Sequence, residues 1–125
     1  MKHFLLIVFF LSAFSTLSQA QTGCGATGRY VQKIFTVNAA PTTVTYGQNT
    51  DLGGTAKTLK MDIYRPDNDT ETNRPVIVLA FGGSFIGGSR TGGDVVPIAK
   101  AWAARGYVAV SIDYRIIPIL QAITA

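Results

Sequence analysis

The pattern of hydrophobic and polar positions divides the chain into three parts. Residues 1–20 contain a short apolar run, residues 21–56 alternate only partially, and residues 57–125 carry the clearest strand and helix patterns. Alternation at every second residue predicts a strand with one buried face. A short unbroken apolar run predicts a strand buried on both faces. We therefore expect a leader, then an N-terminal segment with one or two strands, then the main folded part from residue 57 onward.

The first strands are expected before residue 70. Residues 33–47 are rich in Val, Thr, Phe and Tyr, which predicts one or two exposed strands, and the polar residues 47–54 predict a turn. Residues 58–66 alternate cleanly. This pattern predicts a half-buried strand that is antiparallel to the one before it, with two faces made of Leu59, Met61 and Ile63 on one side and Lys60, Asp62 and Tyr64 on the other.

Downstream of these strands the pattern predicts a strand, a helix and a second strand. Residues 76–81, VIVLAF, and 107–113, YVAVSID, are the two strands, and the first is apolar enough for burial on both faces. Between them Asp94 can cap a helix through its carboxylate, Pro97 is tolerated in the first turn, and Gly106 is a good stop. The apolar stripe of this helix is expected to hold Val95, Ile98, Ala99, Trp102 and Ala103.

The loop between strand and helix, GGSFIGGSRTGGD, contains six glycines in residues 82–94. A phosphate-binding loop needs a lysine after its second glycine, but Ser89 and Gly88 stand at the two available positions. The glycine spacing of a dinucleotide-binding loop is also absent. A plain turn, which uses glycines to leave the sheet, and an anion hole for acyl transfer both stay open.

The order of motifs resembles the α/β-hydrolase superfamily, in particular its secreted carboxylesterase and lipase branches. The similarity covers roughly residues 57–115 and rests on two motifs, Phe81-Gly82-Gly83-Ser84-Phe85 and Asp113-Tyr114-Arg115. It implies an α/β fold with a mostly parallel sheet, of which this chain would form the N-terminal strands, the oxyanion loop and the first βαβ crossover. The chain departs from the family at two positions, where Phe81 replaces a common histidine and Ser84 the third glycine.

The resemblance also implies a site and a reaction. The backbone N–H groups of Gly83 and Ser84 would form an oxyanion hole for a carboxylic ester, small or polymer-borne, with Gly82 permitting the bend, and no cofactor is expected. The family's nucleophile elbow, G-x-S-x-G, is absent, and the only histidine is His3. We therefore expect the N-terminal portion of a secreted ester hydrolase that is inactive alone. The alternative is a non-enzymatic secreted binding domain on the same scaffold.

Composition narrows the possible partners. The net charge is +4, but the basic residues are scattered, which argues against nucleic acid. One cysteine and one histidine give no metal-binding constellation. Asp113 is interpreted as a structural partner of Arg115 or of a nearby backbone amide rather than as a catalytic acid, and Trp102 as a core residue.

The first twenty residues have the layout of a secretory signal peptide. Lys2 precedes an apolar run, and small residues lead to a cleavage position after Ala20, which predicts a secreted or periplasmic protein. The run is too short for a stable membrane span. Cys24 is a free thiol, or its partner lies outside these 125 residues; a lipid anchor is disfavoured because no leucine stands three positions earlier. Asn68-Asp69-Thr70 fits a glycosylation acceptor in a eukaryotic route.

Overall fold

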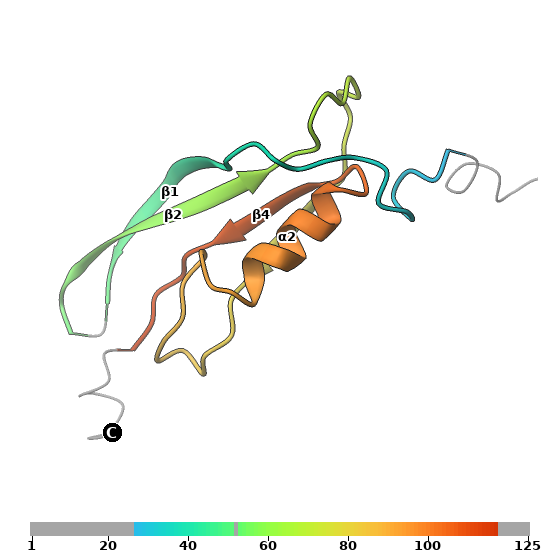
Figure 1. Ribbon diagram of the computed structural model, residues 1–125. Coiled ribbons are helices and arrows are strands. Elements are labelled where there is room, and N and C mark those ends of the chain that lie inside the picture. Colours follow the sequence, from blue (N-terminus) through green and yellow to red (C-terminus); the bar gives the residue numbers. More distant parts are fainter. Residues whose placement is uncertain (1–26, 52, 118–125) are drawn as a thin grey trace, which may run out of the picture.

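The computed structural model describes residues 27–51 and 53–117 (Figure 1). The predicted leader and Cys24 lie outside these residues. The elements follow the chain as β1 (Thr42–Thr50), β2 (Ala56–Tyr64), β3 (Val76–Ala80), α2 (Val95–Ala103) and β4 (Val108–Ile112). The four strands form one sheet in the order β1-β2-β4-β3, and α2 lies against one of its faces. The described part is therefore an α/β structure with two layers.

The sheet is mixed rather than mostly parallel. β1 pairs with β2 and β2 with β4 in antiparallel fashion, and only β3 and β4 are parallel. The predicted antiparallel partner of β2 and the predicted β3-α2-β4 unit are both confirmed. The expectation of a mostly parallel sheet is wrong for these four strands, because the βαβ unit supplies only two of them and the β1–β2 hairpin supplies the other two.

β1 is a single strand that runs further than the sequence pattern indicated. It continues through residues 47–50, which were predicted as a turn, because β2 offers ladder partners as far as Ala56. A bulge between Thr45 and Gly47 leaves Tyr46 as the extra residue. The turn itself begins at Asp51, whose carboxylate accepts hydrogen bonds from two backbone amides further along the turn.

The alternation predicted for β2 is present, but its polar face is the more buried one. Asp62 and Tyr64 are 2% and 3% exposed, whereas the side of Leu59, Met61 and Ile63 is half-buried. The cause is α2, which lies on the Asp62 and Tyr64 side. Small side chains allow the helix to approach the sheet closely, and the resulting core consists of Tyr64, Ala99, Ala103 and Ala109.

β3 is an edge strand with one covered face, so the prediction of burial on both faces is wrong. Leu79 packs against the core under α2, but Val76 and Val78 on the opposite face are 60% and 61% exposed. α2 is the one helix among the described residues and covers a single side of the sheet. No helix in residues 27–51 and 53–117 is long and apolar enough to cross a bilayer.

The ends of α2 differ in how well the sequence predicted them. Pro97 lies in the first turn and Gly106 follows the helix with φ +100°, as expected. Asp94 does not cap the helix, since its backbone is itself helical and its carboxylate makes no capping hydrogen bond. Ile98 also departs from the predicted stripe, because it is half exposed, whereas Trp102 packs against the core as predicted.

A buried carboxylate ties the segment before β1 to the rest of the molecule. Asp69 accepts two hydrogen bonds from the guanidinium of Arg29, at 3.0 and 2.7 Å, and one from Arg74 at 2.7 Å. These bonds, from Arg29 first, outweigh the effect of burial and hold the pKa of Asp69 well below its usual 3.8. The same segment also binds the C-terminal end of α2, because the amides of Ile34 and Phe35 both donate to the carbonyl of Ala104.

Replacing this carboxylate is expected to lower stability in a pH-dependent way. A lowered folded-state pKa contributes stability that is present above the unfolded value and is lost as the pH falls, here below about 4. Asp69→Asn should reduce the free energy of unfolding at pH 7 by about 2 kcal/mol and flatten that acid dependence. Urea unfolding at several pH values measures both effects. Asp94→Asn is the control and should change stability by less than about 0.5 kcal/mol; equal losses in the two variants would contradict the assignment.

Candidate functional site

The residues of both predicted motifs meet at one edge of the sheet. Parallel strands β3 and β4 end side by side there, which is where ligands bind in open α/β sheets. Gly82, Gly83 and Ser84 follow β3, and the segment 113–117 follows β4. Phe81 and Tyr114 join the two, since their rings stack with centroids 4.2 Å apart and the Tyr114 hydroxyl donates to the Phe81 carbonyl at 2.7 Å.

The segment 82–89, here called the glycine loop, folds into a tight turn. Gly83, Ser84 and Phe85 all have positive φ, at +134°, +53° and +62°. The Gly83 carbonyl closes the turn by accepting the amides of Ile86 and Gly87 at 2.9 and 3.3 Å. Two consecutive non-glycine residues in the left-handed region cost about 1 kcal/mol each, a strain that clusters at functional sites.

Two of the glycines are required because the loop folds back on itself. A Cβ on Gly83 would lie 2.1 Å from the Gly87 carbonyl oxygen, and one on Gly88 would lie 2.4 Å from Cδ2 of Phe81. Gly82 and Gly87 have no such neighbour within 4 Å. The fold of the loop therefore requires glycine at positions 83 and 88, where the backbone approaches its neighbours closely. Gly82, by contrast, has space for a side chain.

The amides at the start of the turn have no acceptor among the residues that the structure describes. Among residues 27–51 and 53–117, no oxygen accepts a hydrogen bond from the N–H of Gly83 or of Ser84. The amides of Gly82 and Phe85 likewise have no acceptor among these residues, whereas the amides of Ile86 and Gly87 donate to the Gly83 carbonyl. The Phe85 carbonyl accepts the amide of Ile117 at 2.6 Å. The two predicted donors thus belong to a run of amides, residues 82–85, that donate to no oxygen of the described residues.

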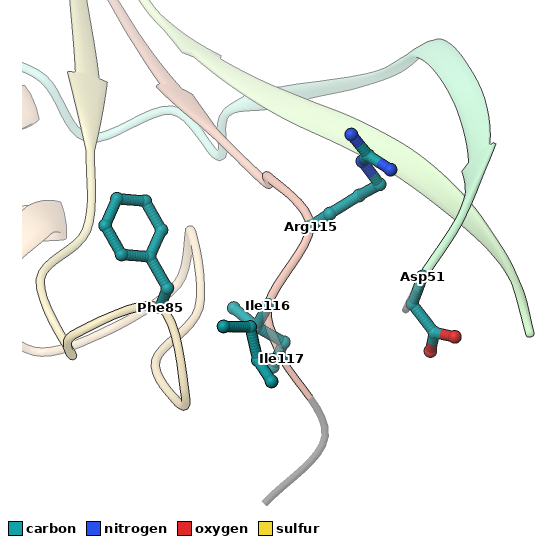
Figure 2. Close-up of a pocket in the computed structure, with 5 residues that line it drawn as sticks. All are labelled: Asp51, Phe85, Arg115, Ile116 and Ile117. Carbon is teal, nitrogen blue, oxygen red and sulfur yellow. The ribbon is translucent and has the colours of Figure 1, made fainter. Parts of the chain in front are cut away.

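Two adjoining cavities lie beside the glycine loop. One has a volume of about 490 Å³ and is lined mainly by aromatic and aliphatic side chains: Ala80, Phe81, Phe85, Ile112, Tyr114 and Arg115. The other, of about 210 Å³, shares Phe85 and Arg115 with the first. Figure 2 shows its walls: Phe85 comes from the glycine loop, Arg115, Ile116 and Ile117 from the segment after β4, and Asp51 from the end of β1. A small apolar group attached to a carbonyl has room there.

A cluster of one arginine and two carboxylates holds the far end of the glycine loop. Arg90 Nη1 lies 2.8 Å from Asp113 Oδ2, and Arg90 Nε lies 3.1 Å from Asp62 Oδ2 without the alignment of a hydrogen bond. Burial opposes the positive charge, but the contacts with Asp62 and Asp113 outweigh it and raise the pKa of Arg90. Burial and the charge of Asp62 likewise raise the pKa of Tyr64.

The structural interpretation of Asp113 agrees with these contacts: of the two predicted partners, Asp113 has a backbone amide, that of Arg90, and not Arg115. Asp113 pairs with the side chain of Arg90 and accepts the Arg90 amide at 3.4 Å. Arg115 instead donates to the carbonyl of Thr50. The sequence reasoning missed Arg90 and Asp62. The available signal was that Arg90 is the one basic residue in a glycine-rich run and Asp62 the one acid in an alternating strand.

The described residues contain backbone amides without a described acceptor but no nucleophile paired with a base. They contain no histidine, and Ser89 and Ser111 bond to Thr91 and to the Arg90 carbonyl. No group of three metal-ligating side chains occurs in residues 27–51 and 53–117. The arrangement can bind a carbonyl oxygen through backbone amides beside an apolar cavity.

The contrast between neighbouring glycines can be tested by substitution. Gly88→Ala places a methyl group against Phe81 at a positive φ and should cost at least about 1 kcal/mol of unfolding free energy. Gly87→Ala, which has open space, should stay within about 0.5 kcal/mol of the wild type. Thermal unfolding compares the two directly. Indistinguishable melting curves would mean that the loop does not pack on Phe81.

The comparisons with known proteins agree with the hydrolase resemblance at the level of the family. The family model described as BD-FAE matches residues 61–123, half of the chain, a span that includes β3, the glycine loop, α2 and β4. No curated protein matches significantly. No solved structure does so either. The chain therefore belongs to the BD-FAE family, a domain family associated with α/β-hydrolase-like esterases.

Proposed function

We propose that this chain is the N-terminal part of a secreted carboxylic-ester hydrolase of the serine type. The amides of Gly83 and Ser84 form its oxyanion hole. The observation that carries this proposal is that the amides of Gly83 and Ser84, within the run of residues 82–85, have no described acceptor at the end of β3 and beside an apolar cavity. Membership of an esterase-associated family supports the reaction class. Residues 1–20 direct export and are removed after Ala20.

In this reaction the nucleophile adds to the ester carbonyl and its oxygen becomes an anion. Backbone amides that are held in position stabilise such an anion with little reorganisation, and each donor is worth about 3 kcal/mol of barrier. Ser84 donates through its backbone, so its hydroxyl is not used. The cavity lined by Phe81, Phe85 and Tyr114 holds the ester's apolar group. The nucleophile, the acid and the histidine come from sequence outside these residues.

The chain alone is expected to be inactive. Purified residues 21–125 contain no histidine and no serine in a nucleophile elbow, so they should hydrolyse p-nitrophenyl acetate no faster than buffer does. Stopped-flow absorbance measures both a burst and steady turnover. A burst that disappears in Ser84→Ala would overturn the assignment of Ser84 as a backbone donor.

In the complete gene product, deleting one donor should slow catalysis strongly. Gly83 and Ser84 both have positive φ, so proline at either position would break the loop as well as remove the N–H. The sharper change replaces the Ser84 amide by an ester, through ribosomal incorporation of the α-hydroxy analogue of serine. We expect kcat to fall about 10²-fold or more, with a smaller change in KM, because the donor acts on the transition state.

The matched control keeps the amide and changes the side chain. Ser84→Ala should leave kcat within a few-fold of the wild type. The two variants differ in a single N–H, so their comparison separates an oxyanion hole from a plain turn. A folded α-hydroxy variant with near-normal kcat would reduce the glycine loop to a turn. The reading frame after Ala125 offers a cheaper check, since the proposal requires a G-x-S-x-G elbow and a histidine there.

A further inference from the structure

We infer that Arg90 is a positioning residue that fixes the glycine loop through Asp62 and Asp113, so that the Gly83 and Ser84 amides are held ready for the oxyanion. This inference rests on the proposed function. Arg90 touches no substrate site itself; it stands directly after the glycine loop, eight residues after Gly82. Its effect on the reaction therefore passes through the backbone.

The contacts of Arg90 come from two strands of the sheet and from the segment that follows β4. Its side chain reaches Asp62 on β2 and Asp113 after β4, and its carbonyl accepts the hydroxyl of Ser111 on β4 at 2.7 Å. Asp62 is fixed in turn by Thr43 of β1, whose hydroxyl donates to Oδ1 at 2.7 Å. Asp62 and Ser111 are 2% and 0% exposed. The position of Arg90 is thus determined on several sides.

Tyr114, the residue after Asp113, holds the start of the glycine loop. Tyr114 stacks on Phe81 and donates to its carbonyl, while Asp113 holds Arg90. The backbone of the motif is itself anchored, because the hydroxyl of Tyr46, the bulge residue of β1, donates to the Asp113 carbonyl. One short segment therefore fixes both ends of the loop relative to the sheet.

The contacts at both ends of the glycine loop are needed because the loop alone would not keep its strained conformation. Ser84 and Phe85 are held in left-handed conformations that cost free energy, and such conformations persist only when the surroundings enforce them. If the anchor at Arg90 loosens, the turn can relax and the two amides can move from their positions. A misplacement of about 1 Å at a catalytic donor can cost as much as 10²-fold in rate.

The primary test is Arg90→Lys. Lysine keeps the charge, but its single ammonium cannot reproduce the planar fork that reaches two carboxylates. Ser111→Ala is a milder second variant, which frees only the Arg90 carbonyl. The control is Asp69→Asn, which breaks the other buried cluster of arginine and carboxylate groups, away from the glycine loop. It should lower stability without changing the loop.

Two measurements are made on each variant. In the ¹⁵N-labelled chain, the order parameters of the Gly83 and Ser84 amides should be about 0.85 in the wild type and in Asp69→Asn and should fall toward about 0.6 in Arg90→Lys. In the complete enzyme, Arg90→Lys should lower kcat at least about tenfold with KM nearly unchanged, and Ser111→Ala should lie between it and the wild type.

The outcomes separate the inference from the function on which it rests. Ordered amides and normal kcat in Arg90→Lys, or a loss of kcat that matches the control at equal melting temperature, would overturn the positioning role. A normal rate in the α-hydroxy Ser84 variant would instead overturn the oxyanion hole. The order parameters are measured without substrate. They therefore test whether Arg90 holds the loop, independently of the result of the kinetic experiment.

Discussion

The geometry of the candidate site depends on how tightly the glycine loop folds back on itself. Between β3 and α2 the chain folds back so tightly that a single Cβ on Gly83 or Gly88 would collide with the loop or with Phe81. That return leaves Ser84 and Phe85 in left-handed conformations, and the amides of Gly83 and Ser84 have no acceptor among the described residues. Gly88 packs closely on the ring of Phe81, and the same ring stacks on Tyr114. The shape of the loop therefore depends on the position of the Phe81 ring.

Charge supplies the second constraint and explains an unusual feature of the sheet. The face of β2 that α2 covers carries Asp62 as well as Tyr64, so the core side includes an acid. A buried carboxylate is tolerable when a cation and hydrogen bonds satisfy it, and here Arg90 and Thr43 do so. Arg90 stands directly after the glycine loop in the chain. The interior of the sheet and the candidate site therefore depend on the same side chain.

Local patterns predicted the elements well and their surroundings poorly. The alternation in β2, the βαβ unit and the helix stop at Gly106 follow from spacing and backbone preference, which act over a few residues. Which face of a strand is covered depends on where a distant helix lies. Hence the buried side of β2, the exposure of Val78 and the exposed Ile98 were not predictable from the pattern. The glycine loop could be located, but Arg90 could not be assigned to Asp62, because the partners lie 28 positions apart and no spacing rule joins them.

The cluster around Arg90 also constrains how the sequence can change over evolutionary time. Loss of the arginine alone would leave Asp62 buried without its cation, and loss of either acid would leave the guanidinium partly unpaired. Each single step passes through a less stable protein, although simultaneous replacement by apolar residues of similar volume would be tolerated by the core. Positions 62, 90 and 113 should therefore drift together or stay fixed, so that their joint variation among descendants would record whether the loop's anchor has been kept or abandoned.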